Sequence, residues 1–99
     1  IMETLFYSAQ GQQYSEAQDV AVPLNCNGMT IINRGDGMAF VNGIPLSANP
    51  TPGNAGESIA IGGNVGEIYA GRCNISFAPG QAAPLLVIVF KYYVNPKYA

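Results

Sequence analysis

The sequence has no histidine and no tryptophan, and it is short of charge. Charged residues make up 10% of the chain, against about 25% in an ordinary soluble domain. Without histidine, the commonest general base and metal ligand is missing. The basic residues do not cluster, so no run could meet a phosphate backbone. The composition therefore predicts no metal, no cofactor and no nucleic-acid partner. The basic residues are Arg34, Arg72, Lys91 and Lys97.

Long hydrophobic runs are also missing. The run Leu85–Phe90 is six residues long and ends at Lys91, whereas a membrane-spanning helix needs about 20 residues. Glu3 stands where a signal peptide would carry positive charge, and no apolar stretch follows it. We therefore expect neither a membrane segment nor a signal peptide. A secreted protein that has lost its leader stays an alternative.

The acidic residues do not pair in a way that suits catalysis. Glu57 and Glu67 flank the turn Gly62–Gly66, and a hairpin there would separate them by on the order of 13 Å. A glycosidase needs two carboxyl groups within about 5–10 Å. No serine or cysteine has a base partner that would activate it as a nucleophile. The sequence predicts that the protein is not an enzyme.

Two cysteines, Cys26 and Cys73, permit one disulfide. It would close a loop of about 48 residues and contribute roughly 4 kcal/mol in the chain-entropy model. We favour the alternative, in which both thiols are reduced and pack as small hydrophobic side chains. The sequence leaves the choice open.

Glycine and proline punctuate the chain. The 12 glycines and 7 prolines fall between short runs rich in Val, Ile, Phe and Tyr. This pattern is typical of an all-β protein. We expect one domain over residues 1–99, a small antiparallel β-sandwich of jelly-roll type with about eight short strands and no long helix. The expected strands are Thr4–Ala9, Ala17–Leu24, Met29–Asn33, Met38–Asn42, Glu57–Ile61, Glu67–Ala70, Cys73–Ala78 and Leu85–Val94.

The tripeptide Arg34-Gly35-Asp36 can bind integrins when a loop displays it. Here the surrounding pattern predicts a hairpin between Met29–Asn33 and Met38–Asn42, with the tripeptide in its turn. That register sets Asn33 opposite Met38 and Ile31 opposite Phe40, which places Met29, Ile31, Met38 and Phe40 on one face. We interpret the tripeptide as a turn, and keep host attachment as an alternative function.

The last expected strand is apolar on both faces. Leu86, Ile88, Phe90, Tyr92 and Val94 alternate on a face that belongs in the core. On the other face, Leu85, Val87 and Val89 precede Lys91. Either a loop of the same chain or a neighbouring subunit must cover these three residues. We predict that they form a self-association face.

Six tyrosines raise the alternative of a carbohydrate-binding module. Tyr92 and Tyr93 are the candidates for stacking on a sugar ring, with a glycan as partner. The lack of tryptophan counts against this function, and aromatic residues are also favoured in sheets for their packing.

Four runs of the sequence resemble small phage virion proteins. They are RGDGMAFVNGIPL, GNAGESIAIGGNVGEIY, CNISF and LLVIVFKYYV, which lie between Arg34 and Val94, a span of somewhat over half of the chain. The resemblance implies a β-sandwich with a non-enzymatic role in a capsid, its decoration, or a spike or fibre base. It also implies a place in the virion after assembly in the host cytoplasm, with copies of itself or other virion proteins as partners. The scarcity of charge agrees with an assembly surface, because little repulsion keeps copies apart.

Overall fold

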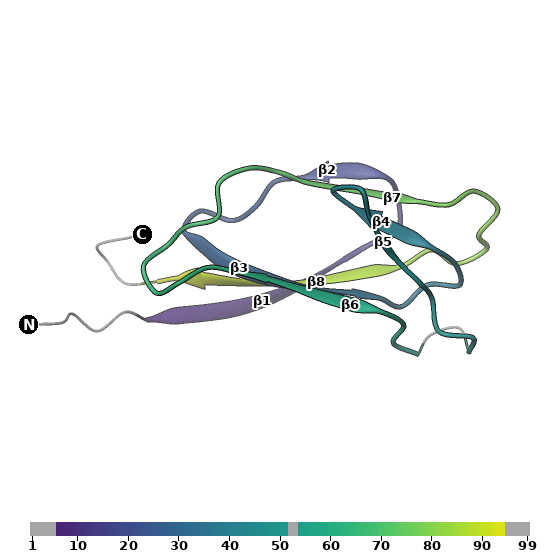
Figure 1. Ribbon diagram of the computed structural model, residues 1–99, viewed down its shortest axis with the longest axis horizontal. Coiled ribbons are helices and arrows are strands. Elements are labelled where there is room, and N and C mark those ends of the chain that lie inside the picture. Colours follow the sequence, from purple (N-terminus) through teal and green to yellow (C-terminus); the bar gives the residue numbers. More distant parts are fainter. Residues whose placement is uncertain (1–5, 52–53, 95–99) are drawn as a thin grey trace, which may run out of the picture.

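The computed structural model of the protein describes residues 6–51 and 54–94. Within these residues, eight strands form two antiparallel sheets of four strands each and no helix is present (Figure 1). The two sheets lie face to face as separate layers (Figure 1). The prediction of an all-β, jelly-roll-like sandwich is confirmed.

Each sheet mixes strands from distant parts of the chain. The first sheet has the order β1-β8-β3-β6, and its strands are β1 (Tyr7–Tyr14), β8 (Leu86–Tyr93), β3 (Cys26–Asn33) and β6 (Ser58–Gly62). The second sheet has the order β2-β7-β4-β5, and its strands are β2 (Gln18–Val20), β7 (Cys73–Phe77), β4 (Ala39–Val41) and β5 (Ile44–Leu46).

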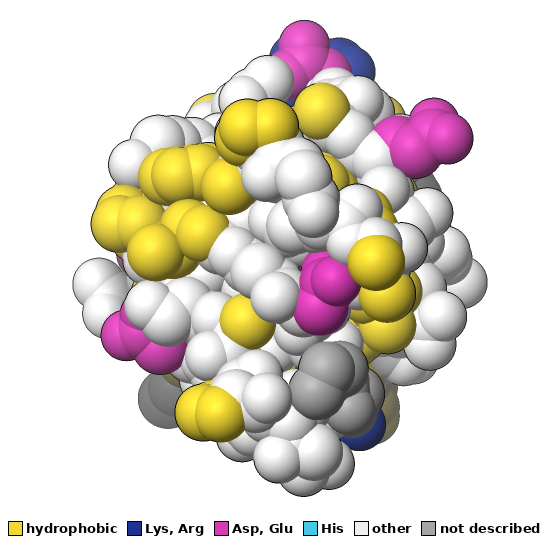
Figure 2. Space-filling model, turned by 90° about the vertical axis from the view of Figure 1, so that its right-hand side faces the viewer, with side chains coloured by type: hydrophobic (Ala, Val, Ile, Leu, Met, Phe, Trp, Pro, Cys, Tyr) yellow, Lys and Arg dark blue, Asp and Glu magenta, His cyan; other side chains and the backbone are white. Residues whose placement is uncertain are grey.

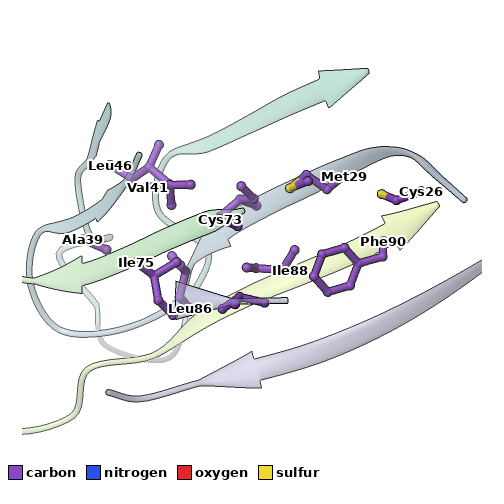
Figure 3. Packing of buried hydrophobic residues seen from close by; sticks show 12 residues of the cluster. Cys26, Met29, Ala39, Val41, Leu46, Cys73, Ile75, Leu86, Ile88 and Phe90 are labelled. Carbon is purple, nitrogen blue, oxygen red and sulfur yellow. The ribbon is translucent and has the colours of Figure 1, made fainter. Parts of the chain in front are cut away.

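The core lies between the two sheets and is filled by alternate residues of the central strands (Figure 3). Leu86, Ile88 and Phe90 of β8 are buried, as the alternation of that strand predicted. Val94 was expected on the same face, but it follows the strand and is 44% exposed. Figure 3 shows the side chains of Leu86, Ile88 and Phe90 pointing toward those of the opposite sheet. The buried residues from the other strands are Val20, Cys26, Met29, Ile31, Ala39, Val41, Leu46, Cys73 and Ile75.

The predicted hairpin across the Arg34-Gly35-Asp36 tripeptide is wrong. Strands β3 and β4 belong to different sheets, so the segment between them crosses from one layer to the other. Ala39 and Val41 face the core, while Met38 and Phe40 are only half-buried. A short hairpin would have left the apolar residues of β4 outside the sandwich, and the crossing instead buries them against the first sheet.

A buried asparagine organises this crossing. The Asn33 side chain donates from Nδ2 to the backbone oxygens of Gly37 and Leu46, at 2.9 and 2.8 Å. Its Oδ1 accepts from the backbone nitrogen of Gly35 at 2.9 Å. Asn33 is fully buried, and these bonds hold the crossing in place of a hairpin ladder.

The first two strands differ from their predicted bounds. Strand β1 overlaps Thr4–Ala9 only at its start and runs on through a glutamine-rich stretch; Thr4 and Leu5 lie outside the described residues. Strand β2 keeps three residues of Ala17–Leu24. Strand β2 lies at the edge of its sheet.

Two other segments differ in kind. Glu67–Ala70 forms no strand, so no hairpin forms across the turn Gly62–Gly66. Strand β5 was not predicted. It pairs with β4 through a two-residue turn in which Asn42 and Gly43 have φ of 49° and 82°. Asn-Gly is the preferred sequence for such a turn, so the signal for this hairpin was present in the sequence.

The segment Ser47–Gly56 has no strand among its described residues. Its ends are held together by Ser47 and Glu57. The Glu57 backbone nitrogen donates to the Ser47 oxygen at 2.9 Å, and the Ser47 backbone nitrogen donates to Glu57 Oε1 at 2.7 Å. Hydrogen bonds to the Glu57 carboxyl from the backbone and the side chain of Ser47 lower the pKa of that carboxyl below its ordinary value.

Candidate assembly surface

The side of the first sheet that faces away from the second sheet is built from three rows of residues, which we call the outer face. The register of the four strands defines each row, because residues directly opposite one another share a face. The rows are Gln13-Val87-Ile32-Ser58, Gly11-Val89-Thr30-Ala60 and Ala9-Lys91-Gly28-Gly62, written in the order β1, β8, β3, β6.

The outer face is almost without charge. Most of its side chains are small, three of its positions are glycine, and Lys91 is its only charged residue. Lys91 lies in the terminal row, and its Nζ is 4.8 Å from the centre of the Tyr7 ring. This cation–π contact holds the charge of Lys91 near Tyr7, at the edge of the outer face. A sheet surface of this kind suits contact with another sheet.

The structure brings together two of the three predicted face residues. Val87 and Val89 lie on β8, one of the two central strands of the outer face, and both are half-buried. Among the described residues, no further layer covers this side of the sheet (Figure 1). Leu85 precedes β8, and its backbone oxygen accepts from the Arg34 nitrogen at 3.0 Å. Leu85 therefore belongs to the crossing between layers and not to a row of the outer face.

Small residues leave a shallow hollow in the outer face. Its volume is about 210 Å³, and Thr30, Ala60, Val89 and Lys91 contribute to its lining. A neighbouring hollow of about 400 Å³ lies beside Gly63, between the end of β6 and the segment 67–70. Sequence reasoning missed both hollows, because they depend on glycines that the register brings together.

The second hollow contains one carboxylate, that of Glu67. Its Oε1 accepts from the backbone nitrogen of Asn64 at 2.6 Å, which closes a local turn. Within residues 6–51 and 54–94, no three His, Cys, Asp or Glu side chains are grouped as a metal site would require. The geometry of this hollow is therefore that of a structural turn.

A bulge in β3 lies opposite Lys91 and Tyr92 of β8, next to the two tyrosines proposed to stack on a sugar. Cys26 pairs with Tyr92 and Gly28 pairs with Lys91, so Asn27 is an extra residue. Asn27 is buried, and its Nδ2 donates to the backbone oxygens of Asn64 and Glu67 at 3.1 and 2.8 Å. The bulge thus anchors the segment 64–67 at this end of the sheet.

Tyr92 and Tyr93 do not form a shared stacking surface. Tyr92 packs against the core, whereas Tyr93 lies on the opposite side of the strand. Tyr93 is 5% exposed, and its hydroxyl accepts from the backbone nitrogen of Gly66 at 2.7 Å. Adjacent residues of a strand point to opposite faces, and the segment 64–67 occupies the space that a ligand would need beside Tyr93.

The Arg34-Gly35-Asp36 tripeptide is held against the body of the protein. Gly35 is buried, and a β-carbon there would lie 2.6 Å from the backbone nitrogen of Leu85. Asp36 Oδ2 accepts from the Ala82 nitrogen at 2.9 Å. The tripeptide is therefore not presented on a protruding loop, as integrin binding requires.

Both cysteines are free and belong to the core. Burial is the main cause that raises the pKa of each thiol. The Cys26 Sγ donates to the Gly28 backbone oxygen at 3.2 Å. The sulfur atoms are packed side chains, as the sequence favoured, and the raised pKa makes the reactive thiolate form scarce.

At the end of the sandwich shown in Figure 2, acidic groups lie at several separate places among uncharged polar and hydrophobic atoms, and at the top a basic group lies beside an acidic one (Figure 2). No helix in the described residues is long and apolar enough to cross a membrane.

The fold and the outer face define an all-β sandwich with one nearly uncharged sheet surface. No family model, curated protein or solved structure matches this chain. Its function is therefore inferred from that surface.

Proposed function

We propose that this protein is a non-enzymatic assembly module whose outer face packs against another copy of the chain. The observation that carries the proposal is the composition of the three rows, which contain a single charge, at Lys91. Solvated sheet faces of monomeric proteins usually alternate with polar and charged residues. A face of small and β-branched side chains can approach a second sheet closely and lose little solvation.

The exposed hydrophobic area supports the same function. Val87, Val89 and Ile32 are half-buried side chains in adjacent strands, and each is left with part of its surface in water. Burying apolar area stabilises an interface by roughly 25 cal/mol per Å². The absence of like charges on the face removes the term that would oppose self-association.

The setting that we propose is a phage virion, as a capsid, decoration, or spike or fibre-base component. The support for it is the resemblance of the turn-and-strand runs to small virion proteins, together with a surface suited to repeated contacts. Locating the protein in purified particles by mass spectrometry would test this setting separately from the self-association.

The experiment that tests self-association compares two valine-to-lysine variants by sedimentation velocity over a wide range of concentration. Val87→Lys places a charge on the outer face, and Val65→Lys places the same charge on a residue that is 84% exposed in the loop after β6. We expect the wild type and V65K to associate equally and V87K to lose mass. Thr30→Lys, at an exposed position of the same face, guards against a folding defect in V87K.

Two results would refute the proposal. A wild-type protein that stays monomeric at the highest concentration has no self-association to explain. If V87K and T30K fold and keep the wild-type mass, the contact lies elsewhere on the molecule.

A further inference from the structure

Among the residues that the structure describes, β1 is a long edge strand that pairs on one side only. It ends the sheet order β1-β8-β3-β6 and pairs with β8 over eight residues without a register shift. The other edge strands are shorter: β2 and β5 have three residues each, and β6 has five. Shortness is one of the ways in which proteins protect a sheet edge, and β1 does not use it.

The phase of the β8 hydrogen bonds shows which backbone groups of β1 face outward. The Val94 backbone nitrogen donates to the Phe6 backbone oxygen, and the Tyr93 backbone nitrogen donates to the backbone oxygen of Asn25 beside β3, both at 3.0 Å. Even-numbered residues of β8 therefore bond to β1, and odd-numbered ones bond to β3. Since even residues of β1 pair with even residues of β8, the odd ones direct their N–H and C=O groups to the free edge. These are Tyr7, Ala9, Gly11 and Gln13.

This edge lacks the other usual protections. The strand sequence YSAQGQQY has no charged residue and no proline, and no bulge twists it away. Gln10 and Gln12 lie on the side that faces the second sheet, yet both are exposed. At the end of the strand, Tyr14 is partly buried against the core. The core therefore reaches β1 at Tyr14, whereas the middle of the strand stays exposed and open to a partner strand.

We infer that β1 pairs antiparallel with β1 of a second copy, about a two-fold axis at Gln10, so that two four-stranded sheets become one of eight strands. The inference extends the proposed self-association function and shares its premise that copies of this chain associate. In this register Tyr7 lies opposite the second copy's Gln13, and Ala9 lies opposite its Gly11. All four outward residues of each copy then face outward residues of the other, which is the arrangement that antiparallel bonding requires.

The occupant is a second copy because the strand is complementary to itself. A shift of the register by two residues in either direction leaves one outward residue of each copy unpaired. The centred register also sets Phe6, which is 57% exposed, opposite the second copy's Tyr14. No charge opposes another across the axis, and the outer faces of both copies become one continuous surface with Val87 and Val89 on each side.

A charge exchange at the two-fold axis tests the pairing. Gln10 is the one residue of the strand that lies directly opposite the same residue of the second copy, at a distance where like charges repel. Gln10→Lys and Gln10→Glu should each weaken edge dimerisation by about tenfold or more. Mixing the two variants should restore a heterodimer of wild-type affinity. Gln12→Lys is the matched control, because Gln12 faces the second copy's Ser8, and it should leave dimerisation unchanged.

Amide hydrogen exchange provides a second readout at the level of single residues. The amides of Ala9 and Gly11 should gain protection as protein concentration rises. The amides of Ser8 and Gln10 already bond to β8 and should change much less.

The outcomes separate this inference from the proposed function. If Q10K and Q10E each keep the wild-type mass, edge pairing is refuted while outer-face association stands. If V87K and T30K keep the wild-type mass and the Gln10 variants lose it, the outer face is refuted and the edge stands. If the mixture does not restore association, the register centred on Gln10 is refuted. A wild type that never associates refutes both.

Discussion

Replacing Asn33 with alanine removes the side chain that holds the crossing between the two sheets. Three hydrogen bonds are lost: two donated by Nδ2, to the oxygens of Gly37 and Leu46, and one accepted by Oδ1 from the nitrogen of Gly35. Asn33 is fully buried and Leu46 is 2% exposed, so water cannot simply replace the lost partner. Asn33→Ala therefore leaves backbone polar groups without hydrogen-bond partners.

The expected loss of unfolding free energy is about 3–5 kcal/mol. A buried donor or acceptor left unpaired costs about 1–3 kcal/mol. Asn33→Ala leaves the Gly35 nitrogen and the oxygens of Gly37 and Leu46 without this partner, and Gly37 is only half-buried. Against a total of about 5–15 kcal/mol for an ordinary domain, this is a large fraction. Asn33→Asp should be destabilised as well, because at neutral pH a carboxylate cannot donate to either oxygen.

Urea unfolding followed by circular dichroism measures this loss directly. Asn54→Ala is the control, since Asn54 is an exposed residue of the 47–57 loop and its change should stay within about 0.5 kcal/mol. A loss below about 1 kcal/mol for N33A, at unchanged m-value, would falsify the assignment of the crossing to this side chain.

Three other perturbations probe the crossing, the core and the loop. Gly35→Ala should lower the free energy of unfolding in urea by about 3 kcal/mol, because the new methyl group would lie 2.6 Å from a backbone nitrogen. Gly62→Ala is the control, because it has open space and should be nearly neutral. Equal effects of the two changes would contradict the packing around Gly35. Cys26 and Cys73 should react with iodoacetamide slowly when native and rapidly in urea, because burial raises both thiol pKa values; fast native labelling would disprove their burial. The lowered pKa of Glu57 means that its stabilisation is present above the unfolded pKa of about 4.3 and is lost as pH falls through the lower folded pKa. Glu57→Gln should therefore flatten the acid limb of a stability–pH curve, and an unchanged limb would count against the Ser47 contacts.

The strands that were predicted well are those whose alternation records burial on one face. In β8, Leu86, Ile88 and Phe90 alternate with less buried residues, and the structure confirms them in the core. The hairpin between β4 and β5 was missed although Asn42-Gly43 marks it, because the strands on each side have only three residues. Short strands carry too little periodicity to stand out.

The candidate surface was predicted in part. The unbroken apolar run identified Val87 and Val89, which share the outer face. It also included Leu85, because alternation alone does not show where a strand begins. The contributions of Thr30, Ala60 and the glycines could not be foreseen, since they come from other strands and depend on the register.

The sequence by itself determined that the chain is all-β, that β8 has one core face, and that the molecule has little charge with which to keep its copies apart. These properties follow from local periodicity, turn residues and composition, which act on neighbours along the chain. Only the tertiary structure decided that β3 and β4 lie in different sheets, that Tyr92 and Tyr93 serve packing, and that β1 is a long open edge. The physical reason is that pairing partners compete across the whole chain, and the winner is the arrangement that buries Ala39 and Val41 while satisfying Asn33.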